Sequence, residues 1–308
     1  MKYISLTNFD ADGAVSAIML DRHYNFEKVF ACGYGKLDSN IRKAIQYAKD
    51  KDIKGICVTD WSLTLKQYML IESNFDDVVM IDHHETSQPV YDHIGQTLDI
   101  KLCAAAQCAR HIVKLGHELT AMDKKLLSAT NAYDNWKTEH KDFMLGRQLT
   151  ELFFHINLWE FIERFPDGFD GFDIMEEHFL ENAFQEKQDT LDRSVVEDVG
   201  GGVVAIVLAD NNIINDTTLM LPQYQSYFIF YRDWNKGNVI VSVRTKRDDV
   251  NVGGRLQAFE ARYKDEVDNS GGHAKAGAIH FVTDDMDHAI DLIEYMMEGF
   301  FDPEVTDE

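Results

Sequence analysis

The stretch Val78-Val79-Met80-Ile81-Asp82-His83-His84-Glu85 joins an apolar run directly to an acid and two histidines. Asp76 and Asp77 precede the run, so its apolar part is typical of a short buried strand bounded by polar residues. The acid and the histidines therefore follow the end of a strand. In parallel α/β sheets, ligands bind at the carboxyl ends of the strands, so we expect a functional site here.

Strands and helices alternate on the amino-terminal side of this stretch. We predict strands over 2–7, 28–32, 55–59 and 78–81, separated by helices over 14–24, 39–49 and 64–71. This alternation indicates βαβ units with right-handed crossovers. The predicted fold class is therefore α/β, with a mainly parallel sheet.

Two differently patterned segments follow. From 104 to about 199 the spacing is helical, and we predict helices over 104–115, 124–133, 146–165 and 174–196. After Gly200-Gly201-Gly202 the pattern changes to strands over 203–208, 226–231, 239–243 and 278–281, with helices over 252–263 and 286–301. We therefore predict a first domain over 1–185 with a helical extension, a helical linker over 186–200, and a smaller α+β domain over 201–308.

The composition is typical of a soluble globular protein. The 308 residues are 45% hydrophobic and 27% charged, and no run approaches the roughly 18 to 20 apolar residues of a membrane helix. The amino terminus has no signal-peptide pattern, so we expect a cytoplasmic protein without a membrane partner. Its four cysteines lack CxxC spacing and lie in apolar surroundings, which predicts buried reduced thiols.

The formal charge of −23 restricts the range of partners. A duplex-binding protein depends on Lys and Arg to neutralise phosphates, so this charge argues against long duplex nucleic acid. A nucleic-acid substrate therefore has to be short, or be held locally by metal ions and a few arginines. The sequence leaves the oligomeric state open, with a homodimer among the options.

Acidic and imidazole side chains gather at three predicted strand ends of the first domain. They are Asp10, Asp12, Asp60, Asp82, His83 and His84. Such groups repel one another in one cleft unless cations lie between them, which indicates a pair of divalent metal ions. The mixed nitrogen and oxygen ligands suit Mn²⁺ best, with Mg²⁺, Co²⁺ or Zn²⁺ as alternatives. Two ions about 3.5 to 4 Å apart can bind a phosphoryl oxygen and activate a water molecule for attack on phosphorus.

Several segments resemble motifs of the DHH phosphoesterase superfamily. Asn8-Phe9-Asp10-Ala11-Asp12-Gly13 resembles its first motif, usually His-x-Asp-x-Asp-Gly, and Thr59-Asp60-Trp61-Ser62 resembles its second. Asp82-His83-His84 is the signature that names the family. Residues 269–277 resemble the Gly-Gly-His-x-x-Ala-Gly motif of the DHHA1 domain, and 241–244 the arginine-bearing strand before it. The resemblance spans nearly the whole chain.

The resemblance implies a role for each of these residues. The implied metal ligands are Asp10, Asp12, Asp60, His83 and Asp134, with Asp60 bridging the two ions. His84 would contact the scissile phosphate or assist proton transfer, and Asp82 would fix the orientation of the histidines. The residues expected to hold the terminal phosphate or nucleotide of the substrate are Arg244, Gly271, Gly272 and His273.

Asn8 departs from the family pattern, which has a metal-binding histidine at this position. An amide oxygen still coordinates a hard cation, but it is a poorer ligand than imidazole for a transition metal. Three outcomes are open: weaker or Mg²⁺-shifted binding through Asn8, a replacement ligand from elsewhere in the chain, or a protein with one metal ion and little activity.

The resemblance therefore predicts a metal-dependent hydrolase of the RecJ-like exonuclease or nanoRNase type, in which the second domain grips the substrate across a cleft. Its expected substrates are short oligonucleotides or small nucleotides, cleaved at phosphodiester or phosphomonoester bonds. The alternative is a degenerate DHH protein that binds or sequesters nucleotides without turnover. A pyrophosphatase is disfavoured, because the family's pyrophosphatases have a different second domain. The choice between RNA and DNA and the direction of degradation stay open.

Overall fold

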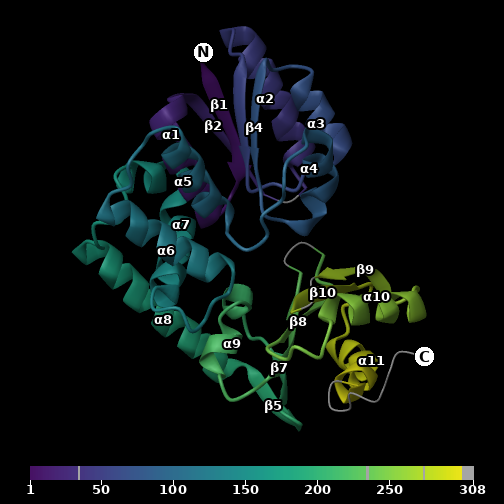
Figure 1. Cartoon of the computed structure of the whole chain (residues 1–308). Helices are drawn as coiled ribbons and strands as arrows, with labels where there is room; N and C mark the ends of the chain where they lie inside the picture. The colour runs from purple at the N-terminus through teal and green to yellow at the C-terminus, as the bar shows by residue number, and fades with distance from the viewer. Residues whose placement is uncertain (34, 234–235, 273–274, 300–308) are drawn as a thin grey trace. The chain divides into compact units, whose positions relative to one another are not determined.

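The computed structural model describes residues 1–33, 35–233, 236–272 and 275–299, and the chain divides into two compact units between Leu180 and Glu181 (Figure 1). The boundary falls inside helix α8 (Ile174–Arg193). Each unit has its own sheet and its own hydrophobic core.

The first unit alternates strands and helices and then becomes helical. Its elements are β1 (Tyr3–Asn8), α1 (Ala11–Tyr24), β2 (Phe26–Cys32), α2 (Leu37–Lys51), β3 (Gly55–Thr59), α3 (Leu65–Glu72), β4 (Asp77–Ile81), the 3₁₀ turn η1 (Glu85–Ser87), α4 (Gln88–Ile94), α5 (Ala104–Lys114), α6 (Ala121–Asp134), α7 (Phe143–Arg164) and the start of α8.

The first sheet is fully parallel, in the order β2-β1-β3-β4. The chain leaves β1 toward one edge to form β2 and then crosses to the other side to form β3, so the strand order reverses between β1 and β3. Ligands bind at such a switch point, outside the carboxyl ends of the strands. The register aligns Thr7 with Thr59 and Thr59 with Ile81, so the residues that follow these three strands emerge at one edge of the sheet.

Helices cover both faces of this sheet (Figure 1). One core joins the sheet to α1, α5, α6 and α7, and a second core joins it to α2, α3 and α4. The central strand β3 is buried on both faces, which explains why it reads as the unbroken run Gly-Ile-Cys-Val-Thr rather than as an alternating pattern. All four cysteines are buried free thiols, as predicted.

The second unit contains a mixed sheet in the order β5-β6-β7-β8-β10-β9, in which only β6 and β7 pair in parallel among the described strands. Its elements after α8 are β5 (Val195–Gly200), β6 (Val203–Val207), η2 (Asn211–Ile213), α9 (Thr217–Met220), β7 (Ser226–Arg232), β8 (Val239–Thr245), α10 (Val252–Arg262), β9 (Val267–Gly272), β10 (Ala276–Phe281) and α11 (Met286–Gly299). Helices α10 and α11 pack on one face of this sheet. The predicted fold class, a parallel α/β unit with a helical extension followed by a smaller α+β unit, is confirmed.

The structure differs from the prediction of a helical linker over 186–200, because only its first part is helical. Helix α8 ends at Arg193, and Val195–Gly200 form strand β5, which pairs antiparallel with β6. Apolar Val195 and Val196 continue the helical pattern in the sequence, but the glycines after them allow a tight turn that folds the segment back as a hairpin. Residues 267–272 also differ from the prediction, because they form strand β9 where no strand was predicted.

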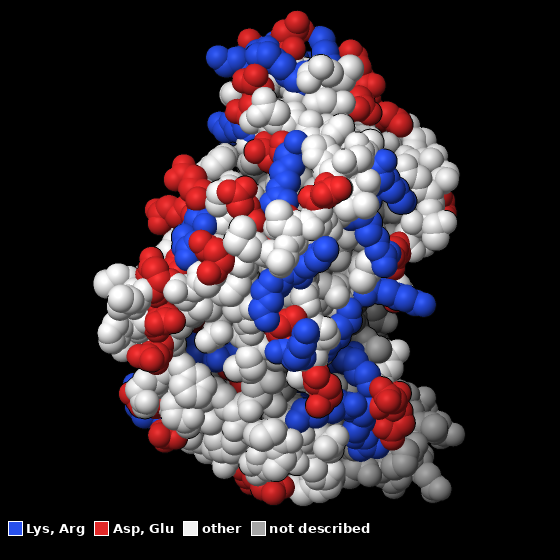
Figure 2. Space-filling view, turned by 60° about the vertical axis from the view of Figure 1, so that its left-hand side comes forward, with Lys and Arg blue, Asp and Glu red and all other residues white. Residues whose placement is uncertain are grey.

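None of the described helices is both long enough and apolar enough to cross a membrane. On the face in Figure 2, Lys and Arg side chains are interspersed with Asp and Glu. The charge of −23 therefore does not make this face uniformly acidic.

Candidate metal centre

The turn from β1 to α1 places Asp10 at the start of a helix. Asp10 is the N-cap of α1, and its Oδ1 accepts a hydrogen bond from the Gly13 backbone N–H at 2.8 Å. Gly13 is required by packing, because a Cβ atom there would lie 2.3 Å from the backbone oxygen of Asn8. Thr7 Oγ1 donates to the Gly13 carbonyl at 3.0 Å and ties the turn to the strand.

Asn8 is buried at the end of β1, and both ends of its amide are engaged locally. Its Nδ2 donates to Asp10 Oδ2 at 2.6 Å, and its Oδ1 accepts from the Phe9 backbone N–H at 2.8 Å. The amide group therefore presents a donor, rather than a ligand oxygen, to the Asp10 carboxylate. Of the outcomes open for this position, the geometry favours those in which Asn8 is not itself a metal ligand.

Asp12 links two helices that are far apart in the sequence. Its Oδ2 accepts from the Ala104 backbone N–H at 2.8 Å, and its Oδ1 accepts from Ala105 at 2.9 Å. These are N–H groups of the first turn of α5, where the helix dipole also favours a negative charge. Each oxygen retains a further lone pair for a cation.

Asp60 follows β3 in a left-handed backbone conformation, with φ 56°. This conformation is uncommon for a residue with a Cβ atom, and Asp tolerates it better than most. The carboxylate is buried, and its Oδ2 has no hydrogen-bond partner among the described residues. A buried carboxylate oxygen without a donor is costly unless something else, such as a cation, satisfies it.

His83 lies between two carboxylates. Its Nε2 is 3.4 Å from Asp60 Oδ1 and 3.5 Å from Asp134 Oδ2, at the carboxyl end of α6. Burial lowers the pKa of His83, although the nearby charge of Asp12 acts against this shift. A neutral imidazole is the form that ligates metal ions.

Asp82 orients His84 from behind. Asp82 is fully buried; its Oδ1 lies 2.7 Å from His84 Nδ1, and its Oδ2 accepts a short hydrogen bond from Ser87 Oγ. Its backbone N–H donates to the Tyr91 hydroxyl at 2.7 Å. Burial acts to raise the pKa of Asp82, but the hydrogen bonds from His84 and Ser87 outweigh it and hold that pKa below its usual value. The ring of His84 is thereby fixed with Nε2 as its outer nitrogen.

The carboxylates of this centre carry mutually unfavourable charge. Burial raises the pKa of Asp12 to about 7, helped by the charge of Asp134, and it raises the pKa of Asp134 to about 7, helped by the charge of Asp10. Burial and the neighbouring Asp10 and Asp12 raise the pKa of Asp60 well above its usual value. A divalent cation relieves such repulsion, and the unpartnered Asp60 oxygen fits a metal ligand.

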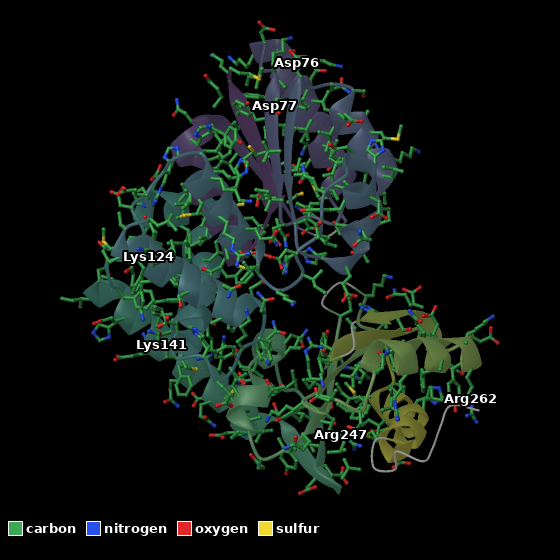
Figure 3. All side chains as sticks on the ribbon, viewed as in Figure 1. Asp76, Asp77, Lys124, Lys141, Arg247 and Arg262 are labelled. Atoms are coloured by element: carbon green, nitrogen blue, oxygen red, sulfur yellow. The ribbon has the colours of Figure 1, made fainter. Side chains whose placement is uncertain are left out.

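The potential ligand atoms form two groups. Asp60, His83 and His84 each offer an atom within 4.8 Å of the others, and so do Asp12, Cys103 and Asp134. The other acidic pair of this sheet, Asp76 and Asp77, lies at the opposite, amino end of β4 (Figure 3), where Asp77 accepts a hydrogen bond from Tyr3 at 2.5 Å.

No family model matches the chain, and no curated protein matches it. Solved structures do match. The DHH domain of a protein described as a member of a ribosomal protein family aligns with a TM-score of 0.64 at 13% identity, over 96% of this chain and 86% of that one. A manganese-bound exonuclease RecJ aligns with a TM-score of 0.52 at 12% identity, over 98% and 91%. RecJ from Thermus thermophilus with Mn²⁺ aligns with a TM-score of 0.51 at 10% identity, over 97% of this chain and 52% of the RecJ chain.

The chain has the fold of the DHH superfamily.

Within this DHH fold, the structure brings together most of the side chains singled out in the first unit. Asp10, Asp12, Asp60, His83 and Asp134 surround one edge of the parallel sheet, with Asn8 beside Asp10 and the Asp82–His84 pair next to His83. Sequence reasoning missed Cys103, which joins Asp12 and Asp134. The sequence places Cys103 directly before a helical run, which is the only sign of its role. Its closeness to Asp12 depends on how α1 packs against α5, which the sequence does not show.

The remaining residues predicted to bind substrate belong to the second unit. Arg244 on β8 is part-buried, and its hydrogen-bond acceptors among the described residues are neutral oxygens: Val243 O, Gly277 O and Asn215 Oδ1. Burial lowers its pKa. Gly271 faces open space, because a Cβ atom there would meet nothing within 4 Å. His273 lies outside the described residues.

Gly272 and Gly277 have a packing role in the neighbouring strands. A Cβ atom on Gly272 would lie 2.4 Å from the Ala276 carbonyl oxygen, and one on Gly277 would lie 2.6 Å from the Gly271 carbonyl oxygen. Close pairing of β9 with β10 therefore requires glycine at both positions.

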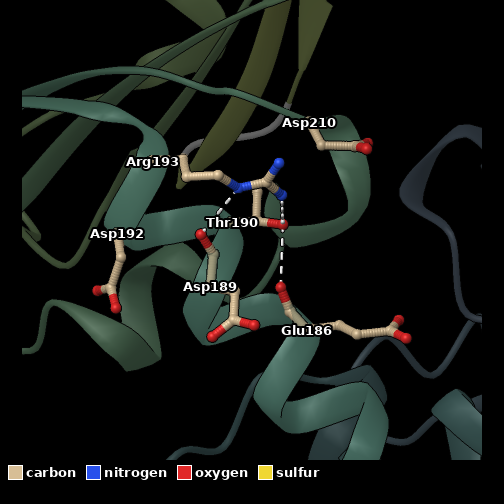
Figure 4. A pocket seen from close by; sticks show the side chains of 6 residues that line it. All are labelled: Glu186, Asp189, Thr190, Asp192, Arg193 and Asp210. Atoms are coloured by element: carbon tan, nitrogen blue, oxygen red, sulfur yellow. Dashed lines mark hydrogen bonds between the residues drawn. The ribbon is translucent and has the colours of Figure 1, made fainter.

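A pocket of about 540 Å³ lies at the carboxyl end of α8, and its lining is mostly acidic (Figure 4). It is lined by Glu186, Asp189, Thr190, Asp192, Arg193 and Asp210. The single arginine donates to the backbone oxygen of Asp189 at 3.1 Å and to Thr190 Oγ1 at 3.4 Å. The surplus of carboxylates disfavours a phosphate ligand in this pocket.

Proposed function

We propose that this chain is a divalent-metal-dependent phosphoesterase that hydrolyses phosphodiester or phosphomonoester bonds of short nucleotidic substrates. The observation that carries the proposal is the buried, unpartnered Asp60 carboxylate oxygen, surrounded by further acids and by His83 at the switch point of a parallel sheet. Bound cations would offset the mutual repulsion of these carboxylates and satisfy the unpartnered oxygen. The likeness of fold to manganese-bound RecJ supports divalent metal use.

The metal ligands in this proposal are Asp10, Asp12, Asp60, His83 and Asp134, and Mn²⁺ is the ion that we expect to bind best, with Mg²⁺ or Co²⁺ as substitutes. Divalent cations in such a centre polarise a phosphoryl oxygen and lower the pKa of water. The donor set of carboxylates and imidazole fits ions of this class.

His84 is proposed to act on the substrate itself. Its Nδ1 is held by Asp82, so Nε2 is the nitrogen that can contact a phosphate oxygen or transfer a proton. Burial acts to lower the pKa of His84, but the bond to Asp82 outweighs it and the pKa is raised, which favours a protonated ring beside an anion. Asp82 therefore positions His84 rather than touching the substrate.

The second unit is proposed to bind the nucleotide. Arg244 offers a planar fork of N–H donors, and its hydrogen-bond acceptors in the described segments do not include an acidic side chain. The open space beside Gly271 lets an anion approach the backbone closely. His273 belongs to this proposal on sequence grounds.

The alternative proposal is a protein that binds nucleotides without turnover. The specific observation in its favour is the Asn8 amide, which donates to Asp10 where the family has a metal-binding histidine. In that case one cation is absent or weakly held, and the substrate-binding residues of the second unit remain intact.

A substrate panel separates these proposals. The chelator-treated protein is incubated with Mn²⁺, Mg²⁺ or Co²⁺ and with labelled short RNA, short DNA, 3′-phosphoadenosine-5′-phosphate, a cyclic dinucleotide and a generic phosphodiester, and the products are resolved by length. We expect metal-dependent cleavage of at least one nucleotidic substrate and none of long duplex DNA. Tight binding of a panel member without cleavage under any metal establishes the alternative.

A further inference from the structure

The second group of potential ligands contains a sulfur atom. Asp12 comes from the first turn of α1, Cys103 directly precedes α5, and Asp134 ends α6, and each offers an atom within 4.8 Å of the other two. Cys103 and Asp12 are buried, whereas Asp134 is partly accessible, with a side-chain exposure of 24%. Asp134 is thus the member of the group that solvent reaches most readily.

Cys103 occupies a helix-capping position that its side chain does not use for capping. It is the N-cap residue of α5, yet its side chain makes no capping hydrogen bond. The Asp12 carboxylate caps the helix instead, through Ala104 and Ala105. Serine, threonine, aspartate or asparagine is the usual N-cap, so a cysteine here gains nothing from capping.

The backbone around Cys103 is held firmly. Its N–H donates to Asn131 Oδ1 at 3.1 Å, and Asn131 lies one turn before Asp134 on α6. The same side chain accepts from Asn135 Nδ2 at 3.1 Å. The Asn131 side chain therefore ties Cys103 to the end of α6 that carries Asp134, as expected for two ligands of one site.

We propose that Cys103 is a metal ligand, which together with Asp12 and Asp134 selects transition-metal ions, Mn²⁺ as well as the softer Co²⁺ and Zn²⁺, over Mg²⁺. Thiolate sulfur prefers such ions, whereas Mg²⁺ requires oxygen ligands. On binding, a metal–sulfur bond replaces the S–H bond, and the thiol proton passes to solvent. The inference rests on the proposed function and deepens it, because Cys103 supplies a ligand in a centre where Asn8 faces Asp10.

Cobalt provides a direct probe, because a thiolate bound to Co²⁺ gives a sulfur-to-metal charge-transfer band in the near ultraviolet, and carboxylate and imidazole ligands do not. The reduced, chelator-treated full chain is titrated with Co²⁺ under anaerobic conditions, and bound metal is quantified by equilibrium dialysis. We expect a saturable band that Zn²⁺ abolishes and excess Mg²⁺ leaves in place. Cys103→Ser is expected to lose the band, while Cys108→Ser on the same helix and Cys32→Ser at the end of β2 retain it.

The outcomes separate this inference from the proposed function. The Cys103 thiol also makes a hydrogen bond with Asp12. If the wild-type chain binds Co²⁺ without the band, this hydrogen bond is the only role of the thiol and the inference is overturned, whatever the variants do. A band that persists in both Cys103→Ser and Cys103→Ala also overturns it. If the chain binds neither Co²⁺ nor Mn²⁺, the proposed function fails together with the inference.

Discussion

Asp60 combines a left-handed backbone, full burial and an unsatisfied carboxylate oxygen. Replacing it with asparagine keeps the shape and suits the backbone, since asparagine also tolerates a positive φ. We expect metal-free Asp60→Asn to melt about 2 to 6 °C higher than the wild type, because removing the charge relieves repulsion from Asp10 and Asp12. The same variant is expected to lose metal-dependent turnover. The measurement is a thermal melt in chelator, paired with the substrate assay.

Asp50→Asn provides the control for this prediction. Asp50 is exposed on α2, where it accepts a hydrogen bond from Gln46, and it lies outside the metal centre. If both variants raise the melting temperature equally, the gain comes from the lower net charge of a chain with charge −23 and not from the metal centre.

Asn8 offers a second prediction at the residue scale. Asn8→His places an imidazole at the end of β1 in place of an amide that binds Asp10. Imidazole is the better ligand for Mn²⁺, so we expect the Kd for Mn²⁺ to fall by about tenfold, equivalent to roughly 1.4 kcal/mol. Isothermal titration of the metal-free protein measures this. An unchanged titration would show that position 8 does not reach the metal.

The residues of the centre differ in how far the sequence predicts them. The Asp-His-His stretch and Asp60 each follow a strand whose end is evident from the sequence, and parallel pairing brings these ends together. Asp12 was expected only as a metal ligand, yet both its oxygens bind the first turn of α5. That contact, and with it the place of Cys103, depends on packing between helices remote in sequence.

At the scale of elements, the β1–α1 turn determines where Asp10 lies. Gly13→Ala inserts a Cβ atom 2.3 Å from the Asn8 carbonyl oxygen. We expect a destabilisation of about 1 to 3 kcal/mol and weakened Mn²⁺ binding, because the backbone that carries Asn8 and Asp10 has to move. Urea unfolding and metal titration measure the two effects.

Gly33→Ala is the matched control, because a Cβ atom at Gly33 meets nothing within 4 Å. It changes the same residue type at the end of a neighbouring strand. We expect stability and Mn²⁺ affinity close to those of the wild type. Similar losses in both variants would contradict the steric explanation.

The strands of the second unit show why some elements cannot be predicted from the sequence. Strand β5 is almost entirely exposed, so its residues carry no alternating pattern, and it is defined by antiparallel pairing with β6. The polar, glycine-rich β9 likewise depends on its pairing with β10. The buried strands β7 and β8 carry strong apolar patterns and are predicted within a few residues.

At the scale of the whole molecule, the proposed metal ligands and the residues proposed to bind the nucleotide lie in different compact units. Arg244→Ala is therefore expected to raise KM for a nucleotidic substrate by about 10- to 100-fold, the value of a lost charge-assisted contact, without changing Mn²⁺ affinity. The control is Arg262→Ala, an arginine at the end of α10 (Figure 3), which should leave KM unchanged. A loss of Mn²⁺ affinity in Arg244→Ala would contradict the division of roles.

The acidic centre also couples the stability of the whole chain to pH and metal. Aspartate in an unfolded chain has a pKa of about 3.9, whereas the pKa values of Asp12 and Asp134 are raised to about 7. Between these values the folded chain binds more protons than the unfolded chain, so its stability falls as the pH rises. The lowered pKa of His83 acts in the opposite direction, but the raised carboxyls outnumber it.

The metal-free protein is therefore expected to melt at a higher temperature near about pH 5 than near about pH 8. We expect Mn²⁺ to bind the deprotonated carboxylates, so an excess of about 100 times its Kd should add roughly 2.7 kcal/mol at the higher pH and less at the lower pH. Saturating Mn²⁺ should thus diminish or reverse the pH dependence, and Asp60→Asn should flatten it. Melting curves with chelator and with Mn²⁺ across this range provide the measurement. A metal-free protein that gains stability as the pH rises would show that these carboxylates are not held together by the fold, because only their enforced proximity and burial raise their pKa values.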